Sequence, residues 1–325
     1  MKKIFIILVF IPVFNWNCTP ANKNSSDSEK FQIIESDNQI KILIDGKHFT
    51  SYLYDSALLK PILFPVYSPS GIRMQRQYPL KTVEGESHDH PHHAGVFFTY
   101  GSDGEVNGNS FWADQKGMTR IQHKSVVSKE TTADKALLEI LADWIGYDGE
   151  IVLTEDRTMV ITSDETENVI DFVFKLKAKD KDVVFKDTKE GMFGIRVADW
   201  LSEEHGNGKY LSSAGDTTEA NIWGKRAEWV RLESQYEGKK MGIIIMNHPE
   251  SVNFPTYWHA RGYGLFAANP LGQSVFQEGR GVENPEPLNY TIPAGGSAIF
   301  RFKMILYEGD RTVDQIETAF EEYIL

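Results

Sequence analysis

Short runs in which apolar and polar residues alternate recur along most of the chain, and they constrain its fold most. Successive side chains of an extended strand point to opposite faces, so such alternation is typical of half-buried β-strands. We predict strands over these runs: 31–35, 39–44, 96–100, 136–140, 150–154, 158–162, 169–176, 182–185, 241–246 and 297–306. Asp45-Gly46 is a strong hairpin-turn signal after the second run. The chain therefore predicts many short strands joined by tight turns.

One segment near the carboxyl end has helical spacing instead. Its apolar positions fall on one helix face: Val313, Ile316, Phe320 and Tyr323. Thr312, followed three residues later by Gln315, predicts a capping box at its start. Many strands with one terminal helix predict an all-β fold, a large antiparallel β-sandwich with a short C-terminal helix. Since 31–325 contains no Pro-, Gly- or Ser-rich linker, we expect a single β-sandwich domain there.

The first 30 residues differ in composition from the rest. A cationic start and the apolar run 4–14 are typical of an export signal, so we predict a signal peptide over 1–17. Cys18 follows directly and predicts lipidation, although 15–17 departs from the usual small-residue lipobox. The polar stretch 18–30 would be a linker between lipid and domain. We expect an exported periplasmic or outer-membrane lipoprotein that touches the membrane only through its anchor; a plain secretory signal is the alternative.

Charge and cysteine content narrow the possible partners. The formal net charge is −12 at neutral pH, and no basic stripe is visible in the sequence. Nucleic-acid binding requires such a stripe, so we expect no nucleic-acid partner. Cys18 is the single cysteine of the chain, which excludes an internal disulfide. The apolar core must therefore stabilise the folded part unaided.

Four of the nine histidines lie in the six-residue segment 88–93. Pro91 favours an extended backbone before it, which would place His88, His90 and His92 on one face and the odd-numbered residues on the other. Imidazole transfers protons near neutral pH and binds metals. The candidate catalytic residues here are His88, His90, His92 and His93. The three on one face also predict a divalent metal site for zinc or copper; the alternative is that some only hydrogen-bond a tight turn.

Residues 187–196 carry four charges between apolar neighbours. If this segment is partly buried, these charges must pair, and burial would shift their pKa values. Glu190 is a candidate acid or base. Lys189 and Arg196 would hold a carboxylate or stabilise an oxyanion. A structural ion-pair network is the alternative interpretation.

Aromatic residues beside amides and bases suit a sugar, whose C–H faces stack on rings while its hydroxyls hydrogen-bond. Trp223 and Trp229 would share one face of an extended segment. In 255–272, His259 and Arg261 would share a face of a strand, and we add His259 to the catalytic candidates. A structural histidine and buried tryptophans are the alternatives. The predicted substrate-binding residues are Asn107, Trp112, Lys189, Arg196, Trp223, Trp258, Arg261 and Asn269.

With these blocks identified, the chain resembles the bacterial PmoA-like family, exported or lipidated proteins labelled methane oxygenase. The matching segments are 88–93 with Gly95, 106–108 with 111–112, 187–196, 223–224 with 226–227, and 255–272. Ala94 and Gly262 depart from the family pattern, which tends to have Arg and an acidic residue there. The methane label implies no activity for this chain. By fold-level analogy, such sandwiches are similar to the galactose-mutarotase-like group, which binds sugars on a concave sheet face using His and carboxylate catalysts.

Three functions remain open from the sequence. The first is a cell-envelope carbohydrate-processing enzyme, an epimerase, lyase or hydrolase acting on a sugar or oligosaccharide through the histidines and Glu190. The second is a non-catalytic glycan-binding lipoprotein whose stacking platforms are Trp112, Trp223, Trp229 and Trp258. The third is a metal-binding redox protein. The density of histidines favours the enzyme, because a binding module needs aromatics and amides but no titrating cluster.

Overall fold

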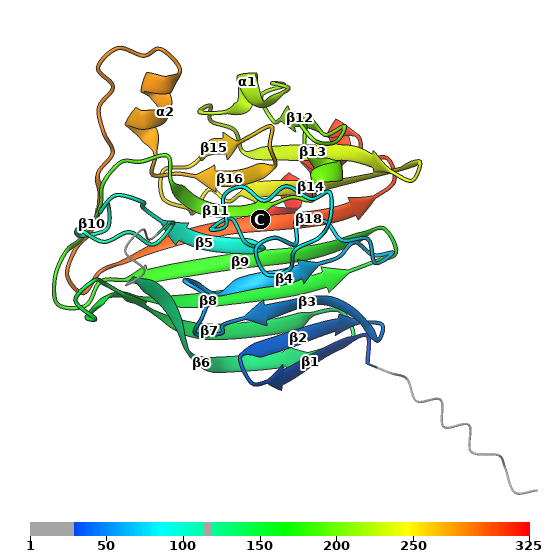
Figure 1. The fold of residues 1–325 in the computed structure, drawn as a ribbon, viewed down its shortest axis with the longest axis horizontal. Helices are drawn as coiled ribbons and strands as arrows, with labels where there is room; N and C mark the ends of the chain where they lie inside the picture. Colours follow the sequence, from blue (N-terminus) through cyan, green and yellow to red (C-terminus); the bar gives the residue numbers. More distant parts are fainter. Residues whose placement is uncertain (1–28, 114–118) are drawn as a thin grey trace, which may run out of the picture.

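Two antiparallel eight-stranded sheets stacked face to face form the body of the protein (Figure 1). The structure is a computed structural model that describes residues 29–113 and 119–325. The predicted signal peptide, Cys18 and nearly all of the predicted linker lie outside the described residues. The all-β sandwich with a short C-terminal helix is confirmed. No helix in the described part of the chain is long and apolar enough to cross a membrane.

The first sheet carries the N-terminal strands and three later ones. Its order is β1 (Phe31–Ser36), β2 (Gln39–Ile44), β3 (Lys47–Leu53), β4 (Ile62–Val66), β5 (Val96–Tyr100), β11 (Gly191–Arg196), β16 (Leu265–Asn269) and β15 (Tyr257–Ala260). The predicted turn at Asp45-Gly46 joins β2 to β3, and both residues have positive φ. Chain segments far apart in the sequence thus become neighbours at β5, β11, β16 and β15.

The second sheet contains the longer strands. Its order is β12 (Lys209–Ser212), β13 (Trp229–Tyr236), β14 (Lys239–Asn247), β18 (Ser297–Glu308), β9 (Glu167–Lys177), β8 (Ile151–Ser163), β7 (Ala136–Ile145) and β6 (Arg120–Thr131). A small sheet pairs β10 (Val183–Phe185) with β17 (Tyr290–Ile292), and η1 (Asp199–Leu201) is a short 3-10 helix. Two short helices, α1 (Glu219–Ile222) and α2 (Gln273–Gly279), lie at the edge where β15 and β12 end their sheets (Figure 1).

Aromatic side chains join the two sheets in the core. Phe98 of β5 stacks on Phe174 of β9 with ring centroids 3.8 Å apart, and Phe193 of β11 stacks on Phe302 of β18 at 4.8 Å. Each large ring removes much apolar surface from water, the main stabilising contribution to folding. These ring stacks therefore anchor β5 and β11, in the middle of the first sheet, to the second sheet.

The outer face of the first sheet is also apolar. Because side chains alternate along a strand, Phe97 points away from the core that Phe98 enters. It belongs to a separate buried cluster that we call the outer cluster: Ile62, Ala94, Phe97, Trp112, Leu265 and Ala267. Strands β5 and β16 are consequently buried on both faces. The outer cluster is the floor of the site described below.

The C-terminal helix α3 (Val313–Ile324) begins as predicted: the Thr312 hydroxyl accepts from the Gln315 N–H, and the Gln315 side chain accepts from the Thr312 N–H. Its buried positions are Ile316, Phe320 and Tyr323. Val313 was predicted on the same face, but it is 44% exposed because it lies in the first turn. The helix packs on β13, β14 and β18, where the indole of Trp229 donates to Glu317 at 3.2 Å. Trp229 therefore packs beneath a helix and lines no groove.

Removal of the N-cap should weaken this packing. We expect Thr312→Ala to lower the free energy of unfolding by about 1 kcal/mol, the usual value of an N-cap hydrogen bond. Thr318→Ala is the matched control, since that hydroxyl is exposed and only bonds back to the Asp314 carbonyl within the helix. Urea unfolding measures both changes. Equal losses in the two variants would contradict the role of the cap.

Candidate functional site

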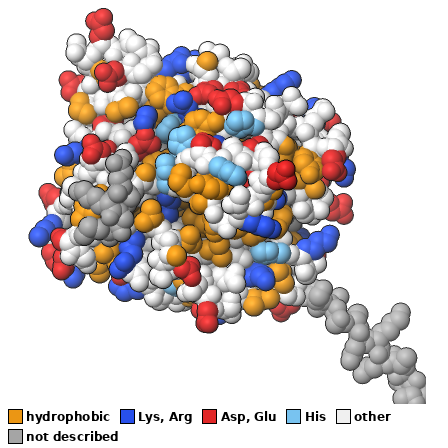
Figure 2. Space-filling view, in the orientation of Figure 1, with side chains coloured by type: hydrophobic (Ala, Val, Ile, Leu, Met, Phe, Trp, Pro, Cys, Tyr) orange, Lys and Arg blue, Asp and Glu red, His pale blue; other side chains and the backbone are white. Residues whose placement is uncertain are grey.

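A pocket of about 410 Å³ opens above the outer cluster. Its walls are His90, His92, His93, Ser102, Trp112, Ala113, Lys189, Glu190, His259, Arg261 and Tyr263. His259 reaches it from β15, because its neighbours Trp258 and Ala260 point into the core on the opposite face. Figure 2 shows histidine side chains gathered on this face among hydrophobic and charged side chains. Residues separated by more than 160 positions thus meet in one cavity.

The histidine segment turns instead of remaining extended. His90 has a φ of 43°, in the left-handed region, and its carbonyl accepts from the His93 N–H at 3.0 Å. A non-glycine residue held there is strained, and such strain is concentrated at functional sites. The rings of His90, His93 and Tyr263 are nearly parallel, with His90 centred 5.0 Å from His93 and 4.9 Å from Tyr263. The turn therefore brings His93 to the same cavity as His90.

The predicted grouping of His88 with His90 and His92 is wrong. His88 is exposed and does not line the pocket; its ring lies against Tyr78, 5.0 Å between centroids. The positive φ at His90 breaks the alternation on which the prediction depended. His92 and His93 approach each other edge to face at 4.3 Å.

The predicted metal site at His88, His90 and His92 fails for the same reason. Across the described residues, no group of three or more His, Cys, Asp or Glu side chains is arranged to hold a metal ion. The rings of His90 and His93 stack face to face, whereas metal ligation needs their nitrogens to converge on one point. The donor set therefore does not fit a three-histidine zinc or copper centre.

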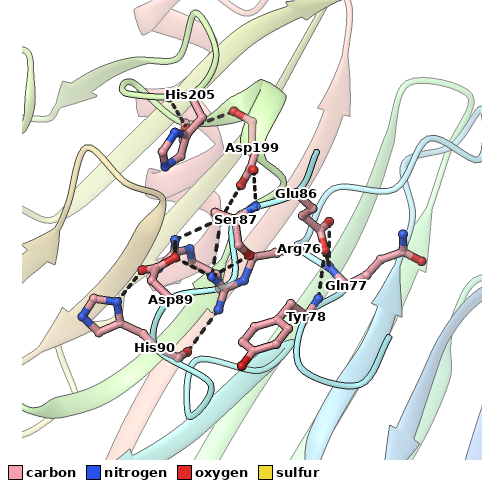
Figure 3. Close-up of polar contacts among 11 residues, drawn as sticks. Arg76, Gln77, Tyr78, Glu86, Ser87, Asp89, His90, Asp199 and His205 are labelled. Carbon is pink, nitrogen blue, oxygen red and sulfur yellow. Dashed lines mark hydrogen bonds and ion pairs between the residues drawn. The ribbon is translucent and has the colours of Figure 1, made fainter. Parts of the chain in front are cut away.

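Asp89 holds the His90 ring in place (Figure 3). Its carboxylate accepts a short hydrogen bond from His90 Nδ1, two from Arg196 at 2.7 and 3.0 Å, and one from Arg76 at 2.8 Å. Burial alone would favour the neutral acid, but the hydrogen bonds from Arg196 and His90 hold the pKa of Asp89 far below its usual range. With Nδ1 bound to a carboxylate, Nε2 of His90 remains as the nitrogen able to accept a proton.

The guanidinium groups of Arg76 and Arg196 are both fully buried. Arg76 also donates to the His90 carbonyl at 3.1 Å, and Arg196 lies 4.6 Å from the ring centroid of Tyr263. We predicted that Arg196 would hold substrate; instead it lies outside the pocket walls and binds Asp89. These two arginines position the histidine turn, because each bonds to both the carboxylate and the surrounding loop.

The other pocket histidines are held neutral. Burial lowers the pKa of His92 to about 4 and that of His259 to about 3, and it lowers the pKa of His93 strongly. Two of these histidines and the neighbouring tryptophan carry buried nitrogens that have no hydrogen-bond partner among the described residues. These atoms are His93 Nδ1 and Nε2, His259 Nδ1, and Trp112 Nε1. Native proteins rarely bury polar atoms unpaired, because each one costs free energy. These unpaired atoms around the cavity make it a candidate site for a polar ligand.

Charged and phenolic groups complete the walls. Lys189 pairs with Glu190, and Arg261 pairs with Glu219 at 2.6 Å. Burial raises the pKa of Tyr263 to about 12, so its hydroxyl remains a hydrogen-bond donor at neutral pH. The predicted residues Glu190, Lys189 and Arg261 thus reach the pocket, as does Trp112 at 1% exposure.

Three predicted substrate contacts lie elsewhere. The indole of Trp258 is in the core and donates to the Ala227 carbonyl at 3.0 Å. The buried Asn269 amide donates to the Thr188 carbonyl at 2.9 Å. Asn107 sits in an exposed turn and bonds to the backbone of β10. These amides and this ring shape the structure around the pocket and do not line it.

Lys60 is a contributor that the sequence analysis missed. The residue is 4% exposed, and its ammonium donates to the carbonyls of His92 at 3.1 Å and Trp112 at 3.0 Å. It also lies 5.4 Å from the ring centroid of Phe97, and burial lowers its pKa to about 7. A single lysine within the apolar run 57–66 was the available signal. Lys60 therefore links His92 and Trp112, two wall residues of the pocket, through their backbone carbonyls.

The depressed pKa of Lys60 predicts a pH dependence of stability. The unfolded chain binds this proton up to about pH 10 and the folded chain only to about pH 7, so folding is favoured increasingly as the pH rises between these values. We expect the stability of the wild type minus that of Lys60→Met to rise over this window, with a slope approaching about 1.4 kcal/mol per pH unit. Urea unfolding from pH 6 to 10 measures it.

The control for this experiment is Lys135→Met, which removes one exposed positive charge. Its stability difference from the wild type should be nearly constant across the same pH range. A flat difference for Lys60→Met as well would show that the buried ammonium does not lose its proton in the folded state.

Residues 39–321 match the family described as a family of unknown function (DUF6807). No curated protein matches. Among solved structures, a galactose 1-epimerase from Lactobacillus acidophilus is 9% identical with a TM-score of 0.41, covering 87% of this chain and 100% of its own. The Slr1438 protein from Synechocystis is 10% identical with a TM-score of 0.36, covering 86% and 96%.

A galactose mutarotase related enzyme from Lactobacillus acidophilus is 7% identical, with a TM-score of 0.35 and coverage of 87% and 98%. At these identities and TM-scores the similarities do not indicate a shared reaction or substrate. The chemistry of this protein has to be argued from its own pocket.

Proposed function

The chain belongs to the DUF6807 family, whose function is unknown, and we propose that it is a carbohydrate-processing enzyme with His90 as its base. The observation that carries this proposal is the Asp89–His90 pair at the wall of the pocket. A carboxylate bound to one imidazole nitrogen fixes the ring and stabilises the charge that forms when the other nitrogen takes a proton. The side chain of His90 is 43% exposed, so a bound substrate can reach it.

The walls of the pocket support a sugar-like substrate. Its volume of about 410 Å³ falls within the usual range for small-molecule sites. Rings of Trp112 and Tyr263 alternate with donors and acceptors, including the unpartnered nitrogens of His93 and His259. A polyhydroxylated ring offers both the C–H faces and the hydroxyl groups that such walls would bind.

The arrangement of acid and base groups favours proton abstraction from carbon. If Nε2 of His90 takes a proton from a carbon beside a carbonyl, negative charge collects on the carbonyl oxygen. The hydroxyl of Tyr263 and the cations of Lys189 and Arg261 are the donors available to stabilise that oxygen. Return of a proton to the carbon completes an epimerisation, whereas loss of a neighbouring group completes an elimination. The protonated hydroxyl of Tyr263 is the wall group that can give a proton to the departing oxygen, because the Glu190 carboxylate is ion-paired with Lys189.

The location of this enzyme rests on the sequence alone. Export and anchoring at Cys18 would place the pocket at the cell envelope, where glycans are available. The resemblance to the PmoA-like family and the lipoprotein assignment both stay predictions.

Replacement of His90 tests the proposed base. We expect His90→Gln to lower turnover by about 10²- to 10⁴-fold, the usual contribution of a positioned general base. Aldoses, uronic acids and disaccharides incubated in D₂O report the reaction in proton NMR spectra, as deuterium exchange at carbon or as new products. Binding of the same sugars should persist in this variant.

His88→Gln is the matched control, because His88 lies two residues away but outside the pocket. It should retain turnover near that of the wild type. Equal loss in both variants, or full turnover in His90→Gln, would remove His90 from the mechanism. Sugar binding with no turnover in the wild type would favour the glycan-binding alternative.

A further inference from the structure

A second cavity of about 300 Å³ adjoins the pocket and has no role in the mechanism above. It is lined by Glu219, Ala220, Trp223 and Arg261. Arg261 lines both cavities, so they are neighbours that share one wall. The ring of Trp223 also lies edge-on to that of His259, with 6.5 Å between centroids. The two cavities are therefore close enough for one extended ligand to contact both.

The indole of Trp223 is held in a fixed orientation. It follows α1 and packs against α2, where the ring of Phe276 lies 5.4 Å away. A Cβ at Gly279 would lie only 2.5 Å from the indole Cη2 atom, so glycine is needed there for α2 to approach the ring. Two helices from distant parts of the sequence thus clamp one partly exposed tryptophan beside the pocket.

Charged groups are fixed beside this ring. The Glu219 carboxylate pairs with Arg261 at 2.6 Å and accepts from the Gly262 N–H at 2.6 Å. The Arg261 guanidinium lies 6.0 Å from the centroid of Trp223. The indole Nε1 of Trp223 is buried without a hydrogen-bond partner among the described residues. A partly exposed aromatic ring beside an ordered ion pair is suited to a sugar ring.

We propose that this second cavity binds a second sugar unit, so that the substrate is a glycoside of at least two sugar rings. The reacting ring would lie among the histidines, the next ring against Trp223, and Arg261 beside the oxygen that joins them. This proposal rests on the proposed function and adds the substrate class to it. Because Arg261 lines both cavities, the arrangement favours one ligand that contacts both. Two separate ligands would not need a shared wall.

Matched pairs of mono- and disaccharides test this proposal by titration calorimetry. The probes are glucose with cellobiose and maltose, and galactose with lactose. We expect the wild type to bind at least one disaccharide about tenfold more tightly than its monosaccharide. Trp223→Ala should lose roughly five- to tenfold in disaccharide affinity, the usual size of one aromatic stacking contact, and keep its monosaccharide affinity. Trp223→Phe retains a ring and should keep most of the preference.

The outcomes separate the two proposals. Equal affinity for both members of every pair, or equal loss for both in Trp223→Ala, would overturn the second sugar site while leaving His90 as the base. A disaccharide preference that depends on Trp223, together with unchanged turnover in His90→Gln, would support the second site and overturn the proposed mechanism. Absence of binding to every probe at millimolar concentration would overturn the second sugar site, while the deuterium-exchange assay with uronic acids decides separately whether His90 is the base.

Discussion

The site depends on one carboxylate held between two buried guanidinium groups. Arg76 and Arg196 would each be costly to bury alone, and Asp89 compensates both while fixing the ring of His90. Arg196 is at the end of β11, inside the first sheet, so the loop 87–93 is bonded to a strand in which every residue is buried. Ser87 extends the network to Asp199: its backbone N–H donates to the Asp199 carboxylate at 2.7 Å, and its hydroxyl donates at 2.8 Å (Figure 3).

Alternation in the sequence predicted the strands that have one face on the core and one in water, such as β2, β7 and β9. It missed β11, β15 and β16, in which every residue is buried. These strands have the core on one face and the outer cluster or the pocket on the other, so no polar residue alternates along them. The pattern also omitted β4, β6, β12, β13 and β17, and it did predict the equally buried β5, so burial on both faces accounts for only part of what was missed. The runs 150–154 and 158–162 proved to be a single strand, β8, because no turn separates them.

The sequence identified the candidate residues by their type, but it did not predict the directions in which their side chains point. Density of histidines and charges identified 88–93, Glu190 and the His259 region, which the structure brings to one pocket. The positive φ of His90 and the pairing of Asp89 with Arg196, 107 positions away, depend on tertiary contacts that no local pattern contains. The same limit applies to Trp223, whose orientation is set by Gly279 on a different helix.

Burial divides the pocket histidines into two kinds. His92, His93 and His259 are desolvated, which keeps them neutral and makes them hydrogen-bonding surfaces. His90 differs because its ring reaches solvent on one side and an ionised carboxylate on the other. In the mechanism that we propose, three imidazoles would bind a polyhydroxylated ring while the fourth exchanges a proton with it.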